Sequence, residues 1–271
     1  MTIKFNNLCV ATIQMVSTAD VARNLADAAR QIERAVAAGA ELLVLPEYFA
    51  IMGRRDTDKL AVAESEGTGP IQDFLAQMAA RHRVWLAGGT IPLRTSDPVR
   101  IRNSLLVFNP QGERVARYDK IHLFGFQKGA ERYNESATIE AGSRPVVFDA
   151  PFGRVGVSIC YDIRFPELYR VQGVVDLQII PAAFTETTGS AHWEILLRAR
   201  AIENQCYVLA VAQGGRHENG RETHGNSMLI DPWGIILDRL PKGPGIVIGD
   251  VDHARIADIR ASLPALKHRV M

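Results

Sequence analysis

The sequence predicts an α/β fold arranged as a four-layer α-β-β-α sandwich, and three observations lead to this prediction. Short apolar runs alternate with helical patterns along the chain, which is typical of layered α/β proteins. Segments of the first half of the chain recur in the second half. No linker rich in glycine, serine or proline divides the 271 residues, so we expect a single domain over residues 1–271.

The internal repeat predicts how the layers are arranged. Three pairs of segments carry it: residues 42–49 and 177–184, residues 84–87 and 207–210, and residues 103–112 and 226–234. The first pair are β-runs broken by proline, and the last pair are β-runs that end in a Pro/Gly hairpin turn. Such a duplication predicts two similar sheets packed face to face about a pseudo-twofold axis, with helices on their outer faces.

The hydrophobic pattern predicts the elements in order. Runs of apolar and β-branched residues between turn residues indicate strands, and apolar residues at three- and four-residue spacing indicate helices. In the first half we expect strands over residues 8–15, 41–45, 84–88, 104–108 and 114–118, and helices over residues 20–38, with Gly39 as C-cap, and 71–82. In the second half we expect strands over residues 155–159, 177–180, 207–212, 227–230, 235–238 and 246–251, and a long helix over residues 191–205.

Composition indicates a protein that acts on a small molecule. The chain is 47% hydrophobic, which is ample for a buried core, and carries 31 basic and 30 acidic side chains without a run of like charge. A nucleic acid or an anionic membrane surface would call for a basic patch, so neither is expected as a partner.

The N-terminus and the cysteines indicate the cytoplasm. Residues 1–7 lead into a strand-like run and do not resemble a signal peptide, and no apolar stretch reaches the roughly 18 residues of a membrane span. Cys9, Cys160 and Cys206 are too few, and odd in number, for a disulfide framework. We expect three reduced thiols in a cytoplasmic protein.

Three polar residues of complementary chemistry each end a β-run. They are Cys160 after residues 156–159, Glu47 after residues 41–46, and Lys120 after residues 113–119. A thiol at a sharp turn after a strand can face a substrate as a nucleophile. A carboxylate, an ammonium and a thiol together are what covalent acyl transfer without a histidine base requires.

The residue chemistry predicts a role for each group. A thiol is largely protonated at neutral pH, so Cys160 needs a base, and Glu47 can take its proton if burial makes the carboxylate basic enough. The ammonium of Lys120 stabilises the thiolate and, with the backbone N–H of Tyr161, can hold the oxyanion of a tetrahedral intermediate. Leaving ammonia takes the proton from Glu47, and a water activated by the same carboxylate hydrolyses the thioester.

Structural interpretations compete with these roles. A cysteine after a buried strand is often an inert core residue, and we interpret Cys9 and Cys206 in this way. Glu47 alone could cap a helix, and Lys120 alone could be an edge-strand lysine; their combination with the long polar string 160–168 favours catalysis. The histidines lack metal-ligand spacing, so no metal or cofactor is expected, and residues 67–70 indicate a turn with an N-cap.

These motifs resemble the nitrilase superfamily of carbon–nitrogen hydrolases over essentially the whole chain. Residues 45–49 match its glutamate motif, residues 118–124 its lysine motif, and residues 156–168 its cysteine motif. The resemblance implies that Glu47 is the general base, Lys120 the proton donor and oxyanion partner, and Cys160 the nucleophile. It also implies a second glutamate, for which Glu135 matches best and Glu131 is the alternative, an α-β-β-α sandwich fold, and homodimers or larger homo-oligomers built through the helical faces.

Within the superfamily the chain resembles the Nit branch. Residues 188–208 and 212–217 are more similar to amidases of deaminated glutathione than to ω-amidases acting on α-ketoglutaramate, while residues 125–127 depart from the aspartate usual after the lysine motif. The resemblance implies hydrolysis of a carboxylate-bearing ω-amide with release of ammonia. The ω-amidase, N-carbamoyl hydrolase and nitrilase activities use the same three side chains and remain alternatives, as does a catalytically silent scaffold.

A carboxylate-bearing substrate requires a cation in its pocket. Arg164 and Arg216 are the candidates, although Arg164 could instead pair with Glu167 or Asp162. The pseudo-twofold axis places Phe184 and Thr185 opposite the three catalytic candidates, as pocket wall and hydrogen-bond donor, and Tyr48 is a further pocket candidate.

Overall fold

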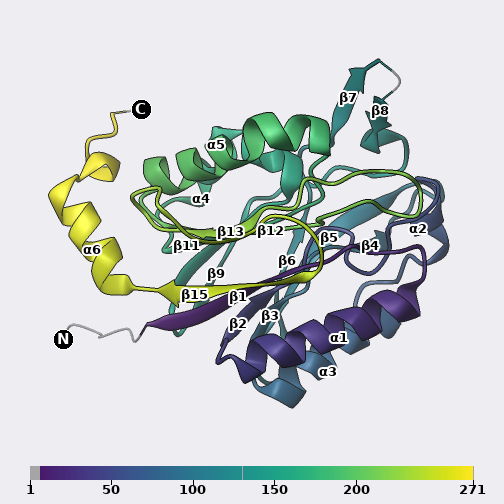
Figure 1. Cartoon of the computed structure of the whole chain (residues 1–271), viewed down its shortest axis with the longest axis horizontal. Coiled ribbons are helices and arrows are strands. Elements are labelled where there is room, and N and C mark those ends of the chain that lie inside the picture. Colours follow the sequence, from purple (N-terminus) through teal and green to yellow (C-terminus); the bar gives the residue numbers. More distant parts are fainter. Residues whose placement is uncertain (1–6, 130, 271) are drawn as a thin grey trace.

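Two mixed β-sheets pack face to face and carry helices on their outer surfaces, as Figure 1 shows. The computed structural model describes residues 7–129 and 131–270. The first sheet follows the order β15 (Gly245–Val251), β1 (Leu8–Gln14), β2 (Leu42–Val44), β3 (Trp85–Ala87), β5 (Ile101–Phe108) and β4 (Ile91–Arg94), and β6 (Arg114–Asp119) also pairs with β5. The second follows the order β14 (Ile236–Leu240), β13 (Ser227–Ile230), β12 (Tyr207–Ala212), β11 (Leu177–Ala182), β10 (Gly153–Val157) and β9 (Val146–Ala150).

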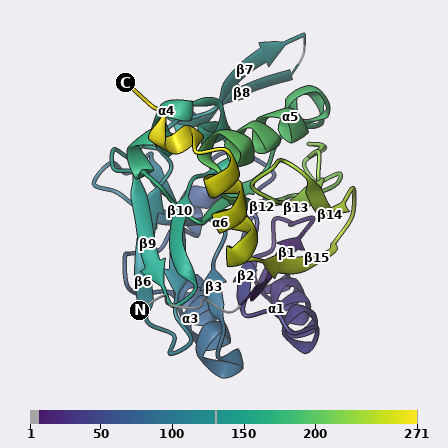
Figure 2. The same cartoon turned by 90° about the vertical axis from the view of Figure 1, so that its left-hand side faces the viewer.

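The helices form the outer layers of the sandwich. On the first sheet lie α1 (Val21–Ala37) and α3 (Pro70–His82), and on the second lie α4 (Pro166–Gln172) and α5 (Glu186–Asn204). The short α2 (Asp58–Ala61) and the hairpin of β7 (Gly125–Lys128) and β8 (Glu131–Asn134) lie at one end, and α6 (His253–Ser262) at the other (Figures 1 and 2). No helix in the described ranges is long and apolar enough to cross a membrane. The predicted α-β-β-α architecture is confirmed.

The two sheets repeat the same pattern of strand directions. Strands β1, β2 and β3 run parallel, and so do β10, β11 and β12. In each sheet an antiparallel strand flanks this triplet on either side: β15 and β5 in the first, β9 and β13 in the second. The repeat expected from the sequence is therefore present in the topology.

The last strand of the chain completes the first sheet. β15 pairs with β1 over its whole length, from Leu8 opposite Val251 to Gln14 opposite Gly245. The sequence predicts this strand but not its sheet, since strand pairing between the two ends of a chain leaves no local pattern.

Side chains alternate between the two sides of the sheet, as strand geometry requires. On β2, Leu42 and Val44 face the second sheet and share a cluster with Ile179, whereas Leu43 packs with Ile32 of α1 and Leu75 of α3. All of these side chains are fully buried. The strand ends are thus held rigidly from both sides.

Several predicted bounds need correction. Helix α5 begins at Glu186 and not at residue 191, because the Thr185 hydroxyl caps it by accepting from the backbone N–H of Thr188 at 3.3 Å. Pro181 does not break its strand: it lies beyond Ile179, the last residue of β11 that pairs with β10, and pairs with Val211 of β12. The sequence interpretation missed β4, β7, β8, β9, α2, α4 and α6.

Candidate active site

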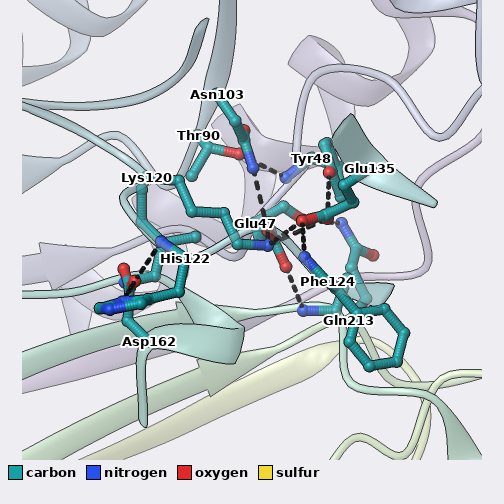
Figure 3. A network of polar contacts seen from close by, with 12 residues as sticks. Glu47, Tyr48, Thr90, Asn103, Lys120, His122, Phe124, Glu135, Asp162 and Gln213 are labelled. Carbon is teal, nitrogen blue, oxygen red and sulfur yellow. Dashed lines mark hydrogen bonds and ion pairs between the residues drawn. The ribbon is translucent and has the colours of Figure 1, made fainter. Parts of the chain in front are cut away.

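Glu47 is held in place by three donors from different parts of the fold (Figure 3). Its carboxylate is 1% exposed; Oε1 accepts from Lys120 Nζ and from Asn103 Nδ2, each at 2.9 Å. Oε2 accepts from the backbone N–H of Ala183 at 2.8 Å, which links the first half of the chain to the second. The Gln213 amide donates to the Glu47 carbonyl at 3.1 Å and fixes the backbone as well.

Lys120 lies between two carboxylates. Its side chain is fully buried, and Nζ donates to Glu47 at 2.9 Å and to the two oxygens of Glu135 at 2.9 and 2.8 Å. Burial by itself would lower the pKa of this ammonium, but the charges of Glu135 and Glu47 outweigh burial and raise it. The lysine therefore carries a permanent positive charge at the site.

Glu135 lies in the short turn after β8 and completes this network. Its oxygens accept from the Tyr48 hydroxyl at 2.8 Å and from the backbone N–H of Phe124 at 2.7 Å. Burial raises the pKa of the carboxyl, but the Lys120 charge and these donors lower it more, so the net direction is downward. Glu131, the alternative left open by the sequence, accepts from Thr187 Oγ1 at 2.7 Å and does not contact Lys120.

Cys160 occupies a strained turn that two residues separate from the end of the strand β10. Its φ of 50° lies in the left-handed region that non-glycine residues rarely adopt, and its side chain is 7% exposed. Burial raises the pKa of the thiol well above its usual range, and the Glu47 charge raises it further, while Lys120 acts in the opposite direction without prevailing. The raised pKa favours the protonated thiol at rest, so a base has to remove its proton when it reacts, and Lys120 acts in the direction that stabilises the thiolate.

Tyr161 follows Cys160 in the 3₁₀ turn Cys160–Arg164. The first N–H groups of a helical turn have no carbonyl partner within the turn, so the Tyr161 N–H is free of such a bond. The turn therefore presents this N–H beside the thiol, where the sequence interpretation places an oxyanion donor.

A buried carboxylate that the sequence interpretation did not use joins the nucleophile turn to the lysine segment. Asp162 accepts from the backbone N–H of Ile159 at 2.9 Å, from the Tyr118 hydroxyl at 2.7 Å, and from the backbone and ring nitrogens of His122 at 3.0 and 2.7 Å. Since Tyr118 and His122 flank Lys120 in the chain, Asp162 couples the position of the thiol to that of the ammonium (Figure 3). The sequence offered one clue to this role of Asp162, since the residue lies only two positions after Cys160.

Cys160 lines a narrow crevice of about 10 Å³. Phe184 and Thr185 line it as the pseudo-twofold argument predicts, and so do Phe124 and Arg221, which the sequence interpretation missed. Tyr48 lines a larger adjoining pocket of about 360 Å³.

The two arginines proposed from the sequence lie elsewhere. Arg164 stands 3.2 Å from His192 Nδ1 and packs over the rings of Tyr161 and Phe184, without an ion pair to Glu167 or Asp162 among the described residues and outside the crevice wall.

Arg216 lines a separate pocket, because the loop after β12 doubles back through the bridge between Arg216 and Glu222. The same loop brings Arg221 to the crevice instead, where Nη2 donates to the Ala183 carbonyl at 2.8 Å and Nε is buried without a hydrogen-bond partner among residues 7–129 and 131–270. Arg221 is therefore the cation that faces the site.

Over the part of the chain that the structure describes, no three His, Cys, Asp or Glu side chains form a group able to hold a metal ion.

Comparison with known proteins gives a consistent result. The model of the family "Carbon-nitrogen hydrolase" matches residues 9–261. The chain is 44% identical to the deaminated glutathione amidase of Synechocystis sp. over 267 residues, covering 96% of this chain and 97% of that protein. It is 41% identical to the deaminated glutathione amidase of Yersinia enterocolitica, covering 97% of this chain and 93% of that protein.

Solved structures show the same similarity. Nit3 of Saccharomyces cerevisiae, described as a member of branch 10 of the nitrilase superfamily, superposes with a TM-score of 0.88 at 30% identity, covering 100% of this chain and 99% of that one. The Caenorhabditis elegans NitFhit protein superposes with a TM-score of 0.89 at 36% identity, covering 99% of this chain and 66% of that longer chain.

The charges around Cys160 predict opposite pH shifts in two variants. Glu47 raises the pKa of the thiol and Lys120 lowers it, so Glu47→Gln should move the pH profile of Cys160 alkylation to lower pH and Lys120→Met should move it to higher pH. The rate of carbamoylmethylation by iodoacetamide, followed at Cys160 by mass spectrometry, measures both shifts, with Cys160→Ala as the blank. Shifts in the same direction in the two variants would contradict this electrostatic description.

Proposed function

This chain belongs to the carbon–nitrogen hydrolase family, and we propose that within it the chain hydrolyses small carboxylate-bearing ω-amides, with deaminated glutathione preferred over α-ketoglutaramate. It is a hydrolase of carbon–nitrogen bonds other than peptide bonds. One observation carries the proposed mechanism: the buried network of Glu47, Lys120 and Glu135 lies within electrostatic reach of the buried Cys160 thiol, just beyond β10.

In the proposed first half-reaction, the Cys160 sulfur attacks the amide carbonyl carbon while Glu47 takes the thiol proton. The carbonyl oxygen becomes an oxyanion, which the Lys120 ammonium and the Tyr161 N–H stabilise. Collapse of this intermediate breaks the carbon–nitrogen bond, and the leaving nitrogen takes the proton from Glu47. The acyl group remains on Cys160 as a thioester.

The second half-reaction uses the same groups with water as the nucleophile. Glu47 takes a proton from water as the oxygen attacks the thioester carbonyl, and Lys120 and Tyr161 hold the new oxyanion. The carbon–sulfur bond then breaks, the sulfur recovers its proton from Glu47, and the carboxylic acid departs. Lys120 keeps its proton throughout, as the two carboxylates around it favour.

The leaving group depends on the amide. Glutathione is γ-glutamyl-cysteinyl-glycine, so removal of its α-amino group leaves a keto acid joined through its far carboxyl to cysteinylglycine. Its hydrolysis releases the amine of that dipeptide, whereas a primary ω-amide releases ammonia. In both cases the acyl part carries a carboxylate, and the proposed anchor for it is Arg221, which lies on the wall of the Cys160 crevice and whose Nε has no hydrogen-bond partner in the described part of the chain.

A homodimer through the outer face of α5 is part of the proposal. Ile195 and Ile202 on this helix are 69% and 48% exposed, and Trp233 and Ile235 on the adjacent β13–β14 turn are 52% and 49% exposed. The Arg198 guanidinium donates to the Gly234 carbonyl, which keeps helix and turn together. An apolar patch of this kind favours association.

The expected location is the cytoplasm. Cys9, Cys160 and Cys206 are free thiols in the structure, which suits a reducing compartment. Fractionation of the source cells, followed with an antibody to the chain, tests this location.

The oligomer is predicted to depend on the α5 patch. Wild-type protein should show twice the chain mass in light scattering at micromolar concentration, and Ile202→Glu should shift it toward monomer because it places a charge in an apolar contact. Val174→Glu, at an exposed apolar residue after α4, serves as the matched control. A monomeric wild type, or an equal effect of the control, would argue against this interface.

Substitutions of Cys160, Glu47 and Lys120 should reduce turnover by different amounts. Cys160→Ala should abolish turnover, Glu47→Gln should reduce kcat about 10²–10⁴-fold, and Lys120→Met about 10²–10³-fold. Lys120→Met also leaves two carboxylates buried without their cation, so a stability loss of about 3–5 kcal/mol is expected and turnover is measured well below its melting temperature. Near-native turnover of folded Lys120→Met would refute the mechanism.

If Arg221 anchors the substrate carboxylate, its substitution should change KM. Arg221→Met should raise KM for deaminated glutathione and α-ketoglutaramate about 10- to 100-fold and leave kcat nearly unchanged, because an interaction remote from the carbonyl acts equally on ground and transition states. Arg216→Met is the control on the same loop and should have no effect. A panel with nitriles and N-carbamoyl compounds completes the test; faster turnover of either class than of every ω-amide would exclude the proposed substrate.

A further inference from the structure

The 360 Å³ pocket adjoins the Cys160 crevice and shares part of its wall. Phe124, Glu135 and Arg221 line both spaces, whereas Cys160 lines only the crevice. The pocket is bounded by the β7–β8 hairpin, the segment that carries α2, and the loop around Arg221. Figure 1 shows α2 and the hairpin at the same end of the molecule.

The two spaces differ greatly in volume. The crevice of about 10 Å³ is comparable to the roughly 10–15 Å³ that one water-sized molecule such as ammonia needs. A pocket of about 360 Å³ is of the size that binds a whole small ligand. The crevice is too small for the acyl part and a dipeptide leaving group together, so substrate beyond the reacting carbonyl extends into the adjoining pocket.

The pocket also contains a lysine without an acidic partner. Among residues 7–129 and 131–270, Lys59 forms no ion pair or hydrogen bond, and its ammonium lies 5.5 Å from the centre of the Tyr48 ring. The neighbouring cations Arg54 and Arg55 pair with Glu218 at 3.8 Å and with Asp58 at 3.4 Å.

The acids on the pocket wall form no direct ion pair with Lys59 in the described part of the chain, although the charges of Glu135 and Asp56 favour its ammonium from a distance. Glu135 pairs with Lys120, Glu131 accepts from Thr187, and Asp56 is exposed. Lys59 is half-buried, and burial lowers its pKa, so the ammonium lacks part of the hydration that stabilises it. A ligand carboxylate within reach would replace that hydration.

We propose that this pocket is a leaving-group subsite that takes a dipeptide-like amine ending in a free carboxylate, with Lys59 as the partner of that carboxylate. The inference rests on the proposed function and assigns the two cations different tasks. Arg221, on the wall shared with the crevice, faces the carboxylate of the acyl part. Lys59, on the pocket side alone, faces the carboxylate of the departing amine.

The test compares three amides of the same keto acid. They are the primary amide, the amide of the thiol-free dipeptide serylglycine, and the amide of serylglycine with its C-terminus converted to a carboxamide. In Lys59→Met, kcat/KM for the carboxylate-ended dipeptide should fall about 10- to 100-fold, and kcat/KM for the other two should change less than about twofold. Lys59→Arg should retain most of the preference, and Arg132→Met, at an exposed residue of the same pocket wall, is the matched control.

Each result supports or overturns a specific statement. An equal loss on all three amides means that Lys59 serves the acyl part, and no loss on any of them means that the subsite is wrong, while the proposed function stands in both cases. A wild-type enzyme that hydrolyses none of the three overturns the proposed function.

Binding provides a readout that does not depend on turnover. Free serylglycine should bind to Cys160→Ala protein in calorimetry, and the added Lys59→Met substitution should weaken this binding about 10-fold or more. Equal binding with and without Lys59 overturns the subsite even if the amides are hydrolysed.

Discussion

The buried ammonium of Lys120 is the interaction on which the site depends. Two carboxylates, Glu47 and Glu135, point at it from strand ends and turns far apart in the sequence, and none of the three side chains is appreciably exposed. Charges buried in this way are tolerable only when each is paired and hydrogen-bonded. The network therefore constrains the backbone around it, including the second half of the chain through the Ala183 N–H, and excludes alternative packings of these loops.

The same charges shift the pKa of the Cys160 thiol. Burial and Glu47 keep Cys160 protonated at rest, which protects it from non-specific reaction and reserves proton transfer for the moment when a carbonyl is in place. The strained φ of Cys160 is maintained because Asp162 accepts one hydrogen bond from Ile159 within the same turn and three from Tyr118 and His122, which flank Lys120. The Cys160 thiol and the Lys120 ammonium are thus positioned as one unit.

Substrate choice is separated from this chemistry. The chemistry of Glu47, Lys120 and Cys160 can act on the carbonyl or nitrile carbon of many substrates. The residues around them decide which substrate is bound, because function on a given fold depends on the site. Here the surroundings divide into a narrow crevice beside Cys160 and a wider pocket beyond it, with Arg221 at their junction and Lys59 on the outer side. Carboxylates on both sides of the scissile bond fit this distribution of charge, whereas a small neutral nitrile would use neither cation.

The sequence by itself determined the layered α/β class, the internal repeat and the three polar residues that end β-runs. Hydrophobic periodicity, turn residues and polar residues at strand ends are local properties, so they can be recognised in the sequence without the fold. It did not determine that Glu135 and not Glu131 meets Lys120, that Arg221 and not Arg164 or Arg216 faces the crevice, or that β15 joins the first sheet. These outcomes depend on how loops double back and on which strands pair across more than two hundred residues. Only the folded chain brings the network around Lys120 together, because the contacts that position Glu47, Asp162 and Arg221 come from distant segments whose spacing carries no periodic signal.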